Sequence, residues 1–151
     1  GIQVPVYQQV GTTTKQVSAG TGFIVRSSGY IITNKHVVQD AGATYTVLLS
    51  NGKQKEGAVI WRSPSEDLAV VKMVGSGYTS IPLGDSSALQ LAQSVFAIGN
   101  ALGQYSNSGG PLVNLSGEAV GVNVAMVQGS QNIGFSLPIS EVIRALANLG
   151  I

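Results

Sequence analysis

The sequence predicts an all-β protein with a single helix at its C-terminus, and three observations support this. Glycine accounts for 20 of the 151 residues, about twice the usual share, and such a surplus is typical of tight turns. The β-branched residues valine and isoleucine number 19 and 11, which favours strands. Short apolar runs alternate with turn signals along most of the chain, and helical spacing occurs only near its end.

Five runs of strand character occupy the first half of the chain, and turn residues separate them. Asn51-Gly52 lies between two of these runs and is the strongest hairpin signal, because both residues tolerate a positive φ. Residues 1–16 are polar and rich in Gln and Thr, which indicates a loose or edge-like start. Together with this start, the five runs would make one small barrel. The runs are Ser18–Val25, Tyr30–Thr33, Tyr45–Leu49, Gly57–Trp61 and Leu68–Met73.

The second half begins with a linker at Gly75–Gly84, where Gly, Ser and Pro cluster. A short helical turn can follow as far as Ala92, capped by Asp85 or Ser86. The chain ends in a predicted helix over residues 140–149, with Ser140 as N-cap and Gly150 at its C-terminal stop. Four further strand runs lie between the linker and the helix. They are Ser94–Gly99, Pro111–Asn114, Ala119–Val124 and Ile133–Leu137.

The composition excludes several functional classes. Eight basic and seven acidic residues give a net charge of +1, which argues against a nucleic-acid partner because such proteins need a basic face. No apolar run reaches the roughly 18 residues of a membrane span. The absence of cysteine removes disulfides, thiol catalysis and cysteine zinc sites, and a single histidine makes a multi-histidine metal site impossible. We therefore expect no metal and no cofactor.

Three polar residues stand where chemistry is possible. His36 follows a strand, Asp67 opens a buried-looking strand, and Ser108 precedes two glycines and another strand. Each has an ordinary structural explanation: a surface histidine, a turn aspartate, a glycine turn. Together they could form a nucleophilic site, because a serine needs a base and the imidazole needs a carboxylate to orient it. Among the three aspartates, Asp40 lies in a turn only four residues after His36 and Asp85 resembles a helix cap, so Asp67 is the remaining candidate.

Five motifs, in the same order, resemble the protease domain of the HtrA/DegP family. The resemblance covers nearly the whole chain and implies a trypsin-like fold of two six-stranded barrels with the site between them. It also implies that His36 is the general base, Asp67 its orienting acid and Ser108 the nucleophile. The motifs are Gly20–Val25, Gly29–Val38, Asp67–Lys72, Ala97–Gly103 and Asn107–Asn114, and Ile133–Pro138 continues the match.

The same resemblance implies a function and a setting. Members are serine endopeptidases that cleave unfolded or misfolded proteins in the bacterial cell envelope without a cofactor, and they form trimers through the N-terminal segment, here residues 1–16. The PDZ module that commonly follows the protease domain does not appear in this sequence. The alternative is a catalytically inactive binding or chaperone-like module that keeps the protease fold.

One departure from the family pattern lies immediately before Ser108. Only Gln104–Asn107 separate Gly103 from Ser108, where the family has several tens of residues, including two strands. Either this sequence omits a segment of the natural protein, which we favour, or the chain carries a true deletion. Ser106 stands where the family has an oxyanion-hole glycine, so only the Ser108 N–H is assigned to that hole and the second donor stays open.

This departure shapes the predicted domain division and the state of the site. We expect an N-terminal segment at 1–16, a first barrel at 17–74, and a linker with a helical turn at 75–92. An incomplete second barrel at 93–139 and a helix at 140–149 complete the protease domain. We also expect a chain interruption beside Ser108, with the site held in a resting, inactive conformation.

The strand that would contact substrate is Asn123-Val124-Ala125, by resemblance to the family. No charged residue occurs there, so a pocket for small or medium aliphatic side chains is favoured over one for basic residues. The alternative, which the sequence supports equally well, is that these residues belong to the barrel core.

Overall fold

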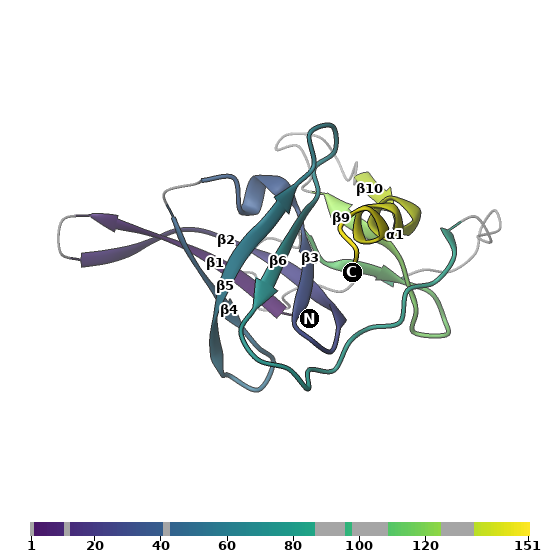
Figure 1. Ribbon diagram of the computed structural model, residues 1–151, viewed down its shortest axis with the longest axis horizontal. Coiled ribbons are helices and arrows are strands. Elements are labelled where there is room, and N and C mark those ends of the chain that lie inside the picture. Colours follow the sequence, from purple (N-terminus) through teal and green to yellow (C-terminus); the bar gives the residue numbers. More distant parts are fainter. Residues whose placement is uncertain (1, 11–12, 41–42, 87–95, 98–108, 125–134) are drawn as a thin grey trace.

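Two sheets and one helix make up the molecule (Figure 1). The structure is a computed structural model. It describes residues 2–10, 13–40, 43–86, 96–97, 109–124 and 135–151.

The first sheet closes on itself into a barrel of strand order β1-β2-β3-β6-β5-β4. Every neighbouring pair is antiparallel, so closure gives each strand a hydrogen-bonded partner on both sides. The long hairpin of β1 and β2 extends beyond the rest of the barrel (Figure 1). The strands are β1 (Ile2–Val10), β2 (Thr13–Arg26), β3 (Tyr30–Thr33), β4 (Thr44–Leu48), β5 (Gln54–Arg62) and β6 (Ala69–Met73).

The barrel confirms the all-β prediction for the first half, since the five predicted runs correspond to β2 through β6. The N-terminal stretch joins the barrel as expected, but its description as loose or edge-like was wrong. β1 pairs with β2 on one side and β4 on the other. The polar composition of β1 gave no sign of this pairing, because strand pairing satisfies the hydrogen bonds of the backbone and does not depend on apolar side chains. The predicted hairpin is present, and Gly52 adopts a φ of 83° between β4 and β5.

The second sheet is open and has four strands within the described residues, in the order β10-β9-β8-β7. This agrees with the expectation of a second barrel that lacks two strands. The predicted helical turn between Asp85 and Ala92 falls almost wholly outside the described residues. The strands are β7 (Phe96–Ala97), β8 (Pro111–Val113), β9 (Ala119–Val124) and β10 (Phe135–Pro138).

Helix α1 (Ile139–Asn148) follows β10 without a loop. The prediction that Ser140 caps the helix was wrong: Pro138 occupies the N-cap position with φ −67° and ψ 147°, and no side chain caps the helix. A strand that ends in proline already has the fixed φ from which a helix can start, so the helix begins before Ser140. The C-terminal stop is as predicted, since Gly150 has a φ of 73° and donates to the carbonyl of Ala147.

Two apolar cores hold these elements together. One fills the barrel and includes Ile31, Val47 and Val71. The other joins the outside of the barrel to the second sheet and to α1, which lies beside β9 and β10 (Figure 1). Its buried residues are Phe23, Val25, Ile32, Leu68, Val70, Ala119, Val122, Ile139, Val142, Ala145 and Leu146.

The predicted linker connects both halves through its backbone. The N–H of Ile81 donates to the carbonyl of Ile24 in β2, and the N–H of Gly84 donates to the carbonyl of Ala119 in β9. The linker therefore adds directional contacts to the apolar core between the halves.

Candidate active site

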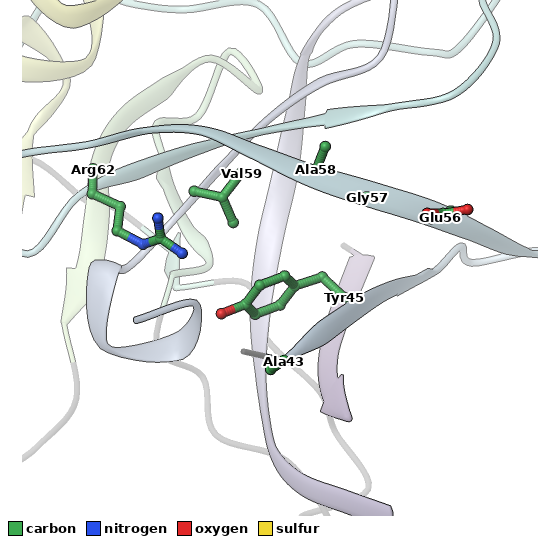
Figure 2. Close-up of a pocket in the computed structure, with 7 residues that line it drawn as sticks. All are labelled: Ala43, Tyr45, Glu56, Gly57, Ala58, Val59 and Arg62. Carbon is green, nitrogen blue, oxygen red and sulfur yellow. The ribbon is translucent and has the colours of Figure 1, made fainter. Parts of the chain in front are cut away.

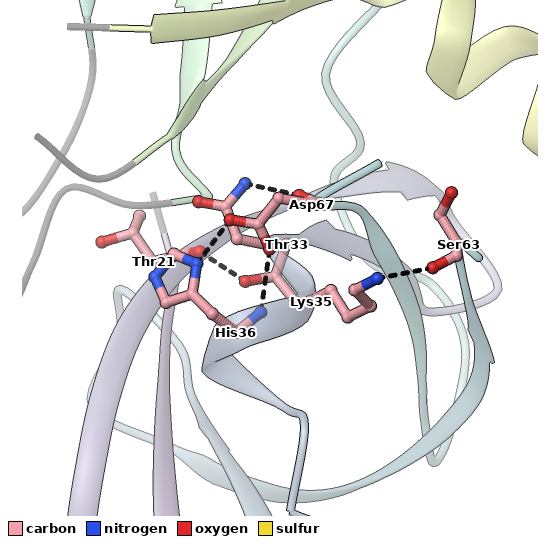
Figure 3. Close-up of polar contacts among 7 residues, drawn as sticks. Thr21, Thr33, Lys35, His36, Ser63 and Asp67 are labelled. Carbon is pink, nitrogen blue, oxygen red and sulfur yellow. Dashed lines mark hydrogen bonds and ion pairs between the residues drawn. The ribbon is translucent and has the colours of Figure 1, made fainter. Parts of the chain in front are cut away.

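His36 and Asp67 meet because β3 ends, and its antiparallel neighbour β6 begins, at the same end of the barrel. β3 ends at Thr33, which is paired with Ala69 at the start of β6. His36 lies in the short 3₁₀ helix η1 (Lys35–Val37) that follows β3, and Asp67 lies just before β6. The His36 Nδ1 and Asp67 Oδ2 atoms are 2.6 Å apart, and the His36 backbone N–H donates to Asp67 Oδ1 at 2.9 Å (Figure 3).

This contact determines which imidazole nitrogen can act as a base. An ionised carboxylate only accepts hydrogen bonds, so Nδ1 must carry the proton in the bond to Asp67. The Nε2 atom then keeps its lone pair and can take a proton from another group. The His36 and Asp67 side chains are 38% and 28% exposed, so the pair is open to a molecule that approaches from solvent.

Three residues that the sequence did not single out support this pair. Asn34 Nδ2 donates to the Asp67 carbonyl at 2.9 Å, and Lys35 Nζ donates to the Ser63 carbonyl at 2.9 Å. Ser63 Oγ accepts the backbone N–H groups of two following residues of its loop. No local pattern could identify them, because the contacts of Asn34 and Lys35 join residues about 30 positions apart; only their place beside His36 gave a signal.

The predicted nucleophile, Ser108, lies outside the described residues, as do Asn107 and the expected chain interruption. The description resumes at Gly109, whose N–H donates to the Asn123 carbonyl at 2.8 Å. The Asn123 N–H donates in turn to the Gly110 carbonyl at 2.8 Å. The turn after Ser108 is therefore fixed to the end of β9.

Gly109 also packs tightly against the barrel. It has a φ of 89°, and a Cβ atom at this position would lie 2.1 Å from the Thr21 carbonyl oxygen and 2.6 Å from Thr33 Oγ1. Thr33 is buried and donates to that same carbonyl at 2.8 Å (Figure 3). Only glycine fits this contact, which places the Gly109 turn against the strand end that precedes His36.

The predicted substrate residues lie at the end of β9. Asn123 uses both backbone groups in bonds to the glycine turn, and Val124 pairs with Phe135 of β10. Both are half-buried. Ala125 is outside the described residues. The role of these three residues in substrate contact stays a prediction, as does the role of the Ser108 N–H in an oxyanion hole.

A pocket of about 350 Å³ opens elsewhere, between β4 and β5. Figure 2 shows the Arg62 guanidinium and the Tyr45 ring pointing into it. Both side chains are engaged locally, since Arg62 Nε donates to the Val38 carbonyl and the Tyr45 hydroxyl donates to the Asp40 carbonyl. None of the predicted site residues that the structure describes lines this pocket, so it is separate from the His36–Asp67 pair.

Neither a metal cluster nor a membrane helix occurs in the part of the chain that the structure describes. There, no three residues among His, Cys, Asp and Glu converge in a way that could hold a metal ion. No helix in the described ranges is long and apolar enough to cross a membrane.

Comparison with known proteins assigns a family to this chain. The trypsin-like peptidase domain family matches residues 20–107. A probable periplasmic serine endoprotease DegP-like from Chlamydia trachomatis is 34% identical over 166 residues, covering 86% of this chain and 33% of the relative. The putative serine protease HhoB of a Synechocystis species is 33% identical over 171 residues, covering 89% and 41%. A DegP-like protein of Brucella suis is 31% identical over 172 residues, covering 89% and 33%.

These alignments are longer than the parts of the chain that they cover. The chain spans about a third of the length of the Chlamydia relative. The alignment with that relative is 166 residues long, whereas 86% of 151 residues is about 130, so about 36 aligned positions have no counterpart here. The match to the peptidase family ends at Asn107, the residue before Ser108. Fold, motifs and relatives agree, and the chain belongs to the HtrA/DegP family of trypsin-like serine endopeptidases, of which it carries the protease domain.

Proposed function

We propose that the chain hydrolyses peptide bonds with His36 as general base, Asp67 as the carboxylate that orients it and Ser108 as nucleophile. The observation that carries this proposal is the 2.6 Å contact between His36 Nδ1 and Asp67 Oδ2. It leaves Nε2 as the proton acceptor, which is the arrangement that activates a serine hydroxyl.

The reaction would proceed in two halves. Ser108 Oγ attacks the scissile carbonyl while His36 Nε2 takes its proton, and the imidazolium then protonates the departing amine. Water, activated by the same nitrogen, releases the acyl group from Ser108. Gly109, the residue after Ser108 in the chain, packs against Thr33, and this contact supports a nucleophile near the segment that carries His36. The Ser108 N–H is our candidate for one oxyanion donor.

We also propose that the natural protein contains a further segment between Gly103 and Ser108. Three facts support this: the four-residue spacing, the roughly 36 unmatched positions, and the end of the family match at Asn107. The segment would supply the second oxyanion donor, so the present chain represents an inactive state. Peptide mapping of the natural polypeptide by mass spectrometry tests this proposal. Additional residues between Gly103 and Ser108 support it, and a peptide that runs from Gly103 through Gln104–Asn107 directly to Ser108 contradicts it.

The names of the relatives support a proposal for the setting of the reaction. Two of them are described as probable periplasmic endoproteases, and we propose the bacterial cell envelope for this protein, with unfolded or misfolded proteins as substrates. We further propose a homotrimer assembled through residues 1–16. Light scattering of the purified protein tests the trimer, because a monomeric mass at working concentration contradicts it.

The test of the activity compares two serine variants of the full-length protein. Ser108→Ala should abolish hydrolysis of casein, since it removes the hydroxyl that is proposed to form the acyl intermediate. Ser116→Ala is the matched control, because Ser116 is an exposed turn residue between β8 and β9 and should keep the wild-type rate. Unchanged hydrolysis by Ser108→Ala contradicts the assignment.

A binding or chaperone-like module is the second candidate, favoured by the second oxyanion donor that stays unassigned. A fluorophosphonate probe separates the two, because it reacts only with an activated serine in a formed site. Labelling of the full-length protein that disappears in Ser108→Ala supports the enzyme. Binding of unfolded protein without labelling supports the module.

A further inference from the structure

We propose that Asn34 and Lys35, the two residues before His36, are positioning residues that set the orientation of the Asp67 carboxylate. This inference rests on the proposed function of the His36–Asp67 pair. It assigns no chemistry to Asn34 or Lys35 themselves, because both act through the loop that carries Asp67.

The pair needs such support because it is exposed. Its side chains are 38% and 28% accessible, and ion pairs open to water contribute little to holding their own geometry. Catalysis nevertheless requires the imidazole to be held within a narrow range of positions. The orientation of Asp67 must therefore be imposed by contacts that are better shielded from water.

Three consecutive residues contact the loop Ser63–Asp67, and the contacts of Asn34 and Lys35 are part-buried whereas that of His36 is exposed. Asn34 Nδ2 donates to the Asp67 carbonyl, and the His36 N–H donates to Asp67 Oδ1, each at 2.9 Å. Lys35 Nζ donates to the carbonyl of Ser63 at 2.9 Å (Figure 3). Both ends of the loop are thus tied to the segment that carries His36.

The loop is closed by its own hydrogen bonds, so it should move as one body. The Ser63 N–H donates to the Leu68 carbonyl at 2.9 Å. Ser63 Oγ accepts the N–H groups of Ser65 at 3.3 Å and Glu66 at 3.0 Å. In such a unit, loss of a contact at either end changes the direction in which the Asp67 carboxylate points.

Asn34 itself is hard to explain by stability alone. It is fully buried, and its Oδ1 atom has no hydrogen-bond partner among the described residues. A buried, unpaired polar atom is unfavourable, and a leucine, which has the same branching pattern without polar atoms, would avoid that cost. Asn34 also precedes η1 without capping it, since its side chain makes no cap hydrogen bond. Among the described residues, the hydrogen bond that the Asn34 side chain makes is the one from Nδ2 to the Asp67 carbonyl.

The test uses Asn34→Leu in the full-length protein with two readouts. The first is the low-field proton NMR signal of the imidazole Nδ1–H, which is assigned to His36, the one histidine of this sequence, by its loss in His36→Gln. The second is the fluorophosphonate labelling rate of Ser108. We expect Asn34→Leu to keep its melting temperature, lose or broaden the NMR signal, and label about 10-fold more slowly or worse. Lys35→Met should weaken the signal less, because it removes only the contact to Ser63.

Thr33→Val is the matched control for the NMR signal. Thr33 is equally buried and also donates one side-chain hydrogen bond, but to Thr21 rather than to the Asp67 loop, so the His36 signal should persist. A persistent signal in folded Asn34→Leu overturns the inference, as does its loss in Thr33→Val. If Asn34→Leu does not fold, an unchanged signal in Lys35→Met overturns it. A wild-type protein that shows the His36 signal but is not labelled by the fluorophosphonate contradicts the proposed function. Loss of the His36 signal in Asn34→Leu would still support the inference in that case.

Discussion

The barrel and the C-terminal sheet contribute to the candidate site in different ways. In the barrel, His36 and Asp67 are brought together by pairing of β3 with β6 and by hydrogen bonds within one closed sheet. In the C-terminal sheet, the Gly109 turn is placed by its bonds to Asn123 and by packing against Thr21 and Thr33 of the barrel. The proposed base and its carboxylate are therefore set by contacts within the barrel, whereas the turn that follows the proposed nucleophile depends on packing between the halves.

The largest expected effect lies in the barrel half. Asp67→Asn keeps the shape of the side chain but presents an amide to His36 Nδ1, which favours the tautomer with the proton on Nε2. Such a change lowers kcat by about 10⁴-fold in serine proteases, and we expect a loss of that order in casein hydrolysis by the full-length protein.

Asp40→Asn is the control for this loss. It removes the same charge four residues after His36, and Asp40 is exposed and has no assigned part in the reaction. Its rate should stay within about twofold of wild type, in keeping with surface substitutions in general. Equal losses in the two variants would show that charge near the site matters rather than the orientation of His36.

In the C-terminal half, Gly109→Ala should displace the turn that packs against the barrel. The new Cβ would lie 2.1 Å from the Thr21 carbonyl oxygen, and a φ of 89° is strained for alanine. The turn must shift by an ångström or more, for which we expect a loss of about 100-fold in fluorophosphonate labelling, while the His36 Nδ1–H signal persists. Gly117→Ala is the control, because it has a similar φ of 79° with nothing within 4 Å and should label normally.

The sequence predicted the barrel more completely than the C-terminal sheet, because the barrel strands carry local signals and the packing of the sheet does not. Alternating runs and a hairpin signal are local features, so β2 through β6 could be located from the residues themselves. The polar β1 was misjudged, since its place depends on backbone pairing with two distant strands. His36 and Asp67 could be named from motifs, but Asn34, Lys35 and Ser63 act through backbone carbonyls across the fold, which no spacing reveals.

A smaller effect is expected from loosening the apolar packing between the two halves while the barrel stays folded. Leu146 of α1 is 1% exposed in the core between the halves, and Leu146→Ala should cost about 2–5 kcal/mol of folding free energy. Hydrogen exchange should show lost protection in β8 and β9, with β3 and β6 still protected. Ile143→Ala, a change at an exposed position of the same helix, should alter neither. Uniform loss of protection would show that the halves unfold as one unit.

The smallest effect tests whether glycine strain alone distinguishes the two halves. Gly52 in the β4–β5 hairpin and Gly150 after α1 have φ values of 83° and 73°, and a Cβ atom added at either position would have no neighbour within 4 Å. Gly52→Ala and Gly150→Ala should therefore each cost only the backbone strain, about 1 kcal/mol in urea unfolding. Neither should change fluorophosphonate labelling, because neither glycine touches Thr21, Thr33 or the Gly109 turn. A loss of labelling in Gly150→Ala alone would show that the end of α1 helps to dock the second sheet. The dependence on docking would then extend from the Gly109 contact to the whole C-terminal half.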